Sequence, residues 1–362
     1  MPIITKDRGL LALGVTVIGW GVSSSFSLVK TVNERHDRDP GTYPHWSDLS
    51  TTAIWFAIFM LAHAVSFLVL GPTARHLIPK KAYWSSEVWV AKLERFCSAV
   101  FQLGLSIAAT VFLYRTLEQS SWLPATLGGT GSTLNCWGDG FPLQPNPYAL
   151  RKFYLIFMGF SSAEMVGHII RERKRPDFQE LLVHLVVTNI LLVFSYFGNF
   201  IRIGSLVMLA HSFSDIFVYF AKALVDTKIT GGALSYIPLL VVYVWCRIYV
   251  HSAVILRSIW MEAPSAVPVP GLANWHYLNF LLSVLLMLHM YWMFVIVKIG
   301  LFLLSTGKSS DLQASLSSLN VRTHIPHGTQ FNPSGEMNPD LSAEDVKSVT
   351  ASEKRKNTTR RR

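Results

Sequence analysis

Two stripes of polar side chains interrupt an otherwise apolar stretch of this chain, residues 177–224. The first consists of Glu180, His184, Thr188, Ser195, Asn199 and Arg202, and the second of His211, Asp215, Tyr219 and Lys222. At about 100° per residue, each set falls on one face of a helix, with a short bend between the two helices at residues 198–200. Imidazoles and carboxylates so placed can move protons or form covalent intermediates. The spacing therefore predicts a site built between two helices.

The helices that position these stripes are apolar enough to cross a membrane. The chain is 51% hydrophobic and 15% charged, and apolar windows of about 20 residues recur along it. We predict an all-α polytopic membrane protein, and a cleaved signal peptide is the alternative for its first span. The eight predicted spans are residues 10–29, 52–71, 98–114, 154–170, 181–200, 203–224, 236–256 and 277–304.

Three further predicted spans also carry ionisable residues. Glu164 and His168 share one face of their helix, Arg247 and His251 share a face of another, and His289 lies in the last span. Any one of these is more often an interior hydrogen-bonding group than a catalyst. Polar groups at this depth are costly unless they face one another or a wet cavity. Five helices with such residues therefore predict a shared polar chamber.

The distribution of charge predicts the orientation in the membrane. With eight spans, 22 Lys and Arg residues fall on the side of the two termini and 8 on the other side. Positive charge favours the cytosolic side, so both termini are expected to be cytosolic. The net charge of +10 then reflects these loops and a basic C-terminus, and it does not indicate a nucleic-acid partner. Residues 305–362 are polar and are expected to be disordered.

No metal site is predicted. The three cysteines lie in separate segments without ligand spacing. Cys136 falls in a loop expected to be lumenal, where a buried free thiol is favoured over a disulfide to a partner. The loop 30–51 contains histidine and acidic residues, but Pro40, Gly41 and Pro44 break any helical register, and a solvated loop is favoured over a metal site.

Two connecting segments have distinctive compositions. Residues 72–97 are basic and contain Trp84, Trp89 and Phe96, which favours a cytosolic helix lying on anionic headgroups; binding of a phosphorylated ligand such as a coenzyme is the alternative. Residues 115–153 are rich in glycine and proline. The GGTG sequence there permits a phosphate cradle, but no Lys-Ser/Thr pair follows, so a structured lumenal loop is favoured.

Several segments, in this order and spacing, resemble the ceramide synthase branch of the TRAM–Lag1–CLN8 membrane family. They are KLERFCSAVFQLGL (92–105), CWGDGFPLQ (136–144), KFYLIFMGFSS (152–162), ERKRPDF (172–178), SYFGNFIRIGSLVMLAHSFSD (195–215, close to the Lag1 motif) and LLMLHMYWM (285–293). The resemblance implies a six-helix core over residues 92–304, preceded by two spanning helices in residues 1–91.

The resemblance also implies an activity and a location. A family member would be an acyltransferase of the endoplasmic reticulum membrane that joins the acyl group of acyl-CoA to a sphingoid-base amine. Acyl-CoA would be a co-substrate, with no bound cofactor. Membrane lipids would be partners, and so would a second synthase chain, in a homo-oligomer or in a hetero-oligomer with a paralogue. The expected catalytic residues are His184, His211 and Asp215. The residues expected to line the chamber are Thr188, Ser195, Asn199, Arg202, Ser212, Tyr219, Lys222, Arg247, His251 and His289.

The chain departs from the family at two positions of its paired motifs. The family places a second histidine after His184 and an aspartate after His211, where this chain has Leu185 and Ser212. We expect His184 with Asp215 to supply the minimal acid–base pair and His211 to donate to the oxyanion. The alternatives are a catalytically impaired subunit that regulates an active synthase, and a lipid-binding or translocon-associated family member. The retained residues favour the enzyme.

Overall fold

The computed structural model describes residues 2–80, 85–173, 177–229, 232–267 and 274–306, and all regular structure in these ranges is helical. Eight helices among the described residues are long and apolar enough to cross a membrane, as predicted. The long helices are α1 (Pro2–Arg38), α2 (Leu49–Leu77), α3 (Ser86–Leu117), α4 (Tyr148–Arg171), α5 (Phe178–Phe197), α6 (Ile201–Leu224) and α9 (Trp275–Thr306). The seventh span joins α7 (Tyr236–Tyr243), the π-helical segments η5 (Val244–Leu256) and η6 (Ser258–Glu262), and α8 (Ala263–Ala266).

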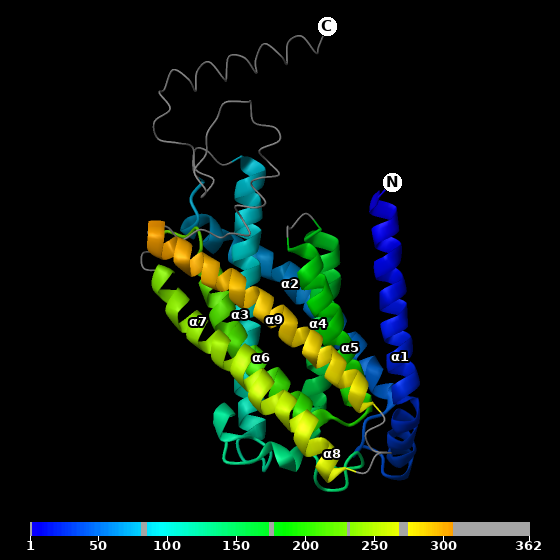
Figure 1. The fold of residues 1–362 in the computed structure, drawn as a ribbon. Helices are drawn as coiled ribbons and strands as arrows, with labels where there is room; N and C mark the ends of the chain where they lie inside the picture. Colours follow the sequence, from blue (N-terminus) through cyan, green and yellow to red (C-terminus); the bar gives the residue numbers. More distant parts are fainter. Residues whose placement is uncertain (1, 81–84, 174–176, 230–231, 268–273, 307–362) are drawn as a thin grey trace, which may run out of the picture.

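The helices form one bundle around the polar residues. α6 packs on α3 and on η5, α4 packs on both α2 and α5, and α9 lies across α5 and η5. Figure 1 shows α9 crossing the bundle obliquely and α1 standing at its edge. The start of α1 and the last described turns of α9 lie at one end, and the connection from α3 to α4 lies at the other (Figure 1).

The predicted bend between α5 and α6 is present and is made by one residue. Asn199 has a positive φ of 60°, a conformation that asparagine tolerates better than most side chains. The turn is closed by hydrogen bonds from the backbone N–H groups of Asn199 and Phe200 to the carbonyls of Tyr196 and Ser195. Because the helix stops here, the register of α5 does not continue into α6.

The connection from α3 to α4, residues 118–147, is an ordered loop, and its glycines have a packing role. A Cβ at Gly129 would lie 2.2 Å from the carbonyl oxygen of Leu123, and one at Gly131 would lie 2.2 Å from that of Ser121. The N–H groups of both glycines already donate to loop carbonyls. The GGTG sequence therefore allows close backbone packing rather than forming a phosphate cradle, and Cys136 is a buried free thiol in this loop.

The segment between α2 and α3 differs from the prediction. The Ser85 hydroxyl caps α3 by accepting from the Val88 N–H, so the helix includes Trp89 and Phe96. Phe96 is buried in a small apolar cluster with the end of α2, and the Trp89 indole donates to the Ile78 carbonyl at 2.9 Å. For these two residues, helix packing replaces the predicted contact with headgroups. Trp84 and the tail from residue 307 lie outside the described residues.

The segment 30–51 is also more regular than predicted. α1 continues to Arg38, and His45 caps a short 3-10 helix, η1 (Trp46–Asp48), by accepting from the Ser47 N–H. The rings of His36 and His45 stack with their centroids 4.5 Å apart, beside Asp37. The polar end of α1 extends the helix beyond the apolar window from which its span was predicted.

Candidate active site

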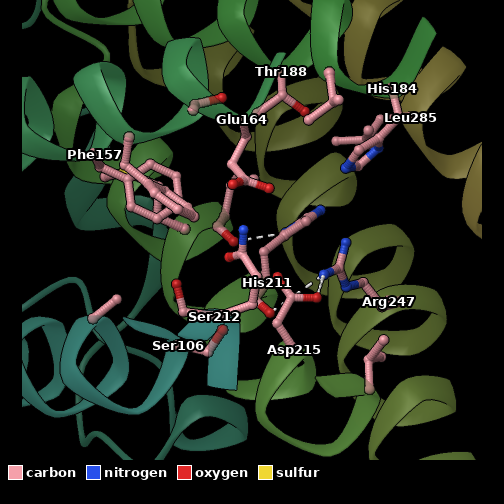
Figure 2. Close-up of a pocket in the computed structure, with 18 of the residues that line it drawn as sticks. Ser106, Phe157, Glu164, His184, Thr188, His211, Ser212, Asp215, Arg247 and Leu285 are labelled. Carbon is pink, nitrogen blue, oxygen red and sulfur yellow. Dashed lines mark hydrogen bonds and ion pairs between the residues drawn. The ribbon is translucent and has the colours of Figure 1, made fainter. Parts of the chain in front are cut away.

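A cavity of about 710 Å³ extends through the helix bundle. Its lining reaches from Arg171 and Lys222, near the ends of α4 and α6, to Trp137 and Trp275 at the end of the bundle where α5 bends into α6. Most of the wall is aromatic or aliphatic. A polar band crosses its middle and includes His184, Thr188, His211, Ser212, Asp215 and Arg247 (Figure 2).

Arg247 is the centre of this polar band. Its side chain is 5% exposed, and its Nη2 donates to Asp215 Oδ1 at 2.5 Å. Its Nε donates to Ser214 Oγ at 2.6 Å, and its Nη1 lies 3.1 Å from His289 Nε2. Figure 2 shows Arg247 and Asp215 directed toward each other, with His184 well apart from both. The expected pairing of Asp215 with His184 was therefore wrong: a buried guanidinium needs a carboxylate, and Arg247 takes it.

Three imidazoles gather beside Arg247. The ring centroid of His211 lies 4.9 Å from that of His289 and 5.8 Å from that of His251. His211 Nδ1 donates to the Val207 carbonyl at 2.8 Å, and His251 Nε2 donates to the Leu282 carbonyl at 3.1 Å. His251 and His289 are fully buried. They belong to the cluster but stand behind His211 rather than lining the cavity.

His184 approaches the cavity from α5. Its ring lies 5.1 Å from that of Trp292 and 6.0 Å from that of His289, and its Nδ1 is buried without a hydrogen-bond partner. Leu185 and Ser212, at the two departures from the family motifs, both line the cavity. The site therefore keeps an available imidazole nitrogen on His184. Compared with the family motifs, it has an apolar side chain, Leu185, in place of a histidine and a hydroxyl side chain, Ser212, in place of an aspartate.

The outcome for the predicted chamber residues is divided. The residues that line the cavity as predicted are Thr188, Ser195, Ser212, Tyr219, Lys222 and Arg247, together with the predicted catalytic residues His184, His211 and Asp215. Ser195 also shares a hydrogen bond of 2.5 Å with the Tyr154 hydroxyl. Four predicted lining residues do not line the cavity: His251 and His289 lie behind His211, and Asn199 and Arg202 lie at the other end of α5 and α6.

Asn199 and Arg202 hold the connection from α3 to α4. The Asn199 amide donates to the carbonyls of Pro142 and Gln144, at 2.6 and 2.9 Å. Arg202 Nη1 donates to the Asn135 carbonyl at 2.9 Å and pairs with Asp139 at 2.8 Å. Their placement on the chamber wall was wrong, because the spacing was counted through the bend as if one helix continued.

The sequence pattern did not assign Glu164 to the site, although it singled out the residue. Glu164 extends from α4 into the cavity, opposite His211 (Figure 2). His168, one turn further along α4, donates from its Nε2 to the Phe178 carbonyl at 3.0 Å. Since a carbonyl only accepts, this nitrogen carries the proton. The one available signal was the spacing of the two residues, which places both on the inner face of α4.

The prediction of no metal site remains a prediction. Two groups among the described residues bring three suitable ligand atoms within 4.8 Å of one another, namely His211, His251 and His289, and His36, Asp37 and His45. In the second group, His45 Nδ1 accepts from the Ser47 N–H at 3.2 Å, which leaves the ring proton on the nitrogen that faces Asp37. A protonated ring nitrogen cannot ligate a metal.

Comparison with known proteins agrees with the sequence resemblance. The chain is 26% identical to ceramide synthase hyl-2 of Caenorhabditis elegans over 294 residues, which covers 76% of this chain and 85% of the relative. It is 29% identical to human ceramide synthase 4 over 337 residues, covering 80% and 84% of the two chains. Residues 95–298, more than half of the chain, match the TLC domain. The chain therefore belongs to the TLC domain family (TRAM, LAG1 and CLN8).

Proposed function

We propose that this protein is a ceramide synthase, which transfers the acyl group of acyl-CoA to the amine of a sphingoid base. The observation that carries the proposal is the cavity, in which an apolar wall suited to acyl chains meets a buried band of histidines and an arginine–aspartate pair. Its volume of about 710 Å³ lies within the range of about 300–1,000 Å³ typical of small-molecule sites. The relatives named as ceramide synthases support the same activity.

The reaction requires a base and a group that stabilises the oxyanion. A neutral amine attacks the thioester carbon, the C–N bond forms, the C–S bond breaks, and the proton lost by nitrogen ends on the thiol. His184 supplies an unpartnered ring nitrogen in the cavity wall. It acts either as a base toward the amine or as a covalent carrier of the acyl group.

The structure supports a different oxyanion donor from the one expected. His211 was expected to donate, but in its neutral form its single N–H already points at the Val207 carbonyl. Arg247 lines the cavity and carries a permanent charge that a developing oxyanion can approach. We therefore assign oxyanion stabilisation to Arg247, with Asp215 holding the guanidinium in place.

The ends of the cavity suggest how the substrates are arranged. Arg171 and Lys222 line the end that the charge distribution places at the cytosolic face, where they can attract the phosphates of coenzyme A. The acyl chain would extend toward Trp137 and Trp275 at the lumenal end. This arrangement belongs to an enzyme of the endoplasmic reticulum membrane with both termini in the cytosol, and with residues 92–304 as its catalytic core.

The test is an assay of the protein purified alone in detergent, with acyl-CoA and a sphingoid base, followed by mass spectrometry of the products. Ceramide formed by the lone protein at several turnovers supports the proposal. No product from the lone, folded protein overturns it. If added protein then raises the output of an active paralogue, its function is that of a structural or regulatory subunit.

A further inference from the structure

Four carboxylates line the cavity among the described residues, and they differ in their partners and their depth. They are Glu164, Glu172, Asp177 and Asp215. Asp215 is already paired with Arg247 at 2.5 Å, and Glu172 and Asp177 flank the short connection between α4 and α5. Glu164 extends into the cavity from within α4 (Figure 2), and it forms no ion pair with a Lys or Arg of the described chain. Of these four, Glu164 is therefore the carboxylate inside the bundle that can receive a cation.

Glu164 lies at the depth of His184. It is seven residues before the end of α4, and His184 is six residues after the start of α5, which correspond to about 10 and 9 Å along two helices that meet at a short connection. The Ser162 hydroxyl donates to the Asn189 amide oxygen at 2.9 Å and fixes this antiparallel register. The next residue of α5 is Leu185, where the family motif has a histidine. Glu164 therefore brings an ionisable group to the depth at which the motif's histidine is missing.

A second polar group lies beside this carboxylate. Gln102 of α3 lines the same cavity, is 2% exposed and is adjacent to the side chain of Glu164. Its amide Nε2 is buried without a hydrogen-bond partner, which is a costly state for a donor. An acceptor beside an unused donor suits a ligand that carries a cation and an oxygen on neighbouring atoms. The head of a sphingoid base has this chemistry, because its ammonium-bearing carbon lies between two hydroxyl-bearing carbons.

The charge of such a substrate must be removed before it can react. A primary amine with an ordinary pKa of about 8–10 is an ammonium ion at neutral pH, and it then has no lone pair with which to attack a thioester. An ammonium ion in an apolar cavity needs a counter-charge. Arg171 and Lys222 favour a negative charge on Glu164, and Glu172 opposes it. When the ammonium and the carboxylate meet away from water, the transfer of one proton leaves two neutral groups.

We propose that Glu164 binds the ammonium group of the sphingoid base and takes its first proton, while Gln102 donates to a hydroxyl of the same head group. The inference rests on the proposed function. The N–H bond of the ammonium breaks, its electron pair stays on nitrogen, and the proton binds a carboxylate oxygen of Glu164. The neutral amine then attacks, and the second proton, lost as the C–N bond forms, ends on the thiol without involving Glu164. Glu164 returns its proton to water after the turnover, and this is the one proton that the net reaction of an ammonium with a thioester releases.

The test removes only the charge of Glu164. We expect E164Q, which keeps the shape of the side chain, to raise the KM for sphinganine about tenfold to a hundredfold, with the KM for acyl-CoA changed less than about twofold. From about pH 6.5 to about pH 7.5, kcat/KM for sphinganine should rise about tenfold in E164Q, because only the scarce neutral amine reacts. The wild type and E164D, which keep a carboxylate, should change less than about threefold over the same range. E172Q is the matched control, the same substitution at a cavity-lining carboxylate of the connection, and should behave as the wild type.

The contrary results are distinct. A wild-type KM for sphinganine and a wild-type pH profile in E164Q would overturn the inference. Equal rises of both KM values with an unchanged pH profile would also overturn it, and a lowered melting temperature of E164Q would then show that Glu164 only supports packing. If the wild-type protein makes no ceramide, the proposed function fails, and binding of tritiated sphinganine at neutral pH tests the site alone. Equal affinity of the wild type and E164Q would then overturn the inference, and weaker binding by E164Q would support it.

Discussion

Among the described residues, two buried arginines each bind an aspartate, one at the bend and one in the chamber. The side chains of Arg202 and Arg247 are both 5% exposed, and their distances to Asp139 and Asp215 are 2.8 and 2.5 Å. Their other partners differ. Arg202 donates to backbone carbonyls of the connection from α3 to α4. Arg247 donates to one backbone carbonyl, that of His211, and also contacts the side chains of Ser214 and His289.

This difference distinguishes an arginine with a structural role from one placed to take part in a reaction. A guanidinium that donates to backbone carbonyls holds a loop in one position, and its aspartate, 66% exposed at Asp139, is a peripheral partner. A guanidinium among titratable side chains sets the charge that a reaction experiences. Polar residues in a transmembrane helix therefore do not by themselves indicate a catalytic site. Contacts with titratable side chains are what point to a catalytic role.

Asp215→Asn should have the largest effect on rate. It removes the charge that holds Arg247 and should reduce kcat by about a hundredfold or more, the usual range for losing a group of an acid–base network. The matched variant is Asp139→Asn at the bend, whose exposed carboxylate should be nearly dispensable for kcat. Equal rates in the two variants would remove the distinction between the pairs.

Arg202→Met should affect stability more than rate. The substitution leaves the part-buried carbonyls of residues 135 and 145 without this donor, at a cost of at most about 1–3 kcal/mol for each group that finds no other partner. Unfolding monitored in detergent should show a lower melting temperature, while the remaining folded fraction keeps its kcat. A normal melting temperature with lost activity would place Arg202 in the chemistry instead.

Restoring the family's paired motifs should improve the chamber. Leu185→His together with Ser212→Asp adds an imidazole and a carboxylate to the cavity wall, and we expect kcat to rise about tenfold. The single substitutions show which member of the pair matters. An unchanged rate in a folded double variant would mean that substrate binding, rather than the acid–base groups, limits turnover.

The smallest effect concerns the thiol of Cys136, which lies in the connection from α3 to α4. Burial raises the pKa of this thiol, so the reactive thiolate is scarce at neutral pH. With Cys97 and Cys246 replaced by alanine, maleimide should label the folded protein slowly, and labelling should accelerate in Arg202→Met as the loop loosens. Fast labelling of the wild-type loop would contradict its description as closely packed.

The fold was largely predictable because its signals are local. Apolar windows revealed eight spans, and the bend was marked by Gly198 and Asn199. The helices are longer than the windows, since polar turns such as those at the end of α1 extend them.

The candidate site was predictable only in part. Spacing placed His184, His211 and Asp215 on inner faces, and all three line the cavity. Spacing along one helix does not show which residues of other helices it contacts, and the pairing of Asp215 with Arg247 was missed for this reason. The change of register at Asn199 explains the misplacement of Arg202.

The central claim is that the chamber itself performs acyl transfer, and His184 tests it most directly. Wild-type protein and His184→Ala, each purified alone, would be given acyl-CoA and a sphingoid base, with melting temperatures measured in parallel. Our account predicts ceramide from the wild type and none above background from the variant, at closely similar stability. Wild-type turnover by the folded variant would contradict the account.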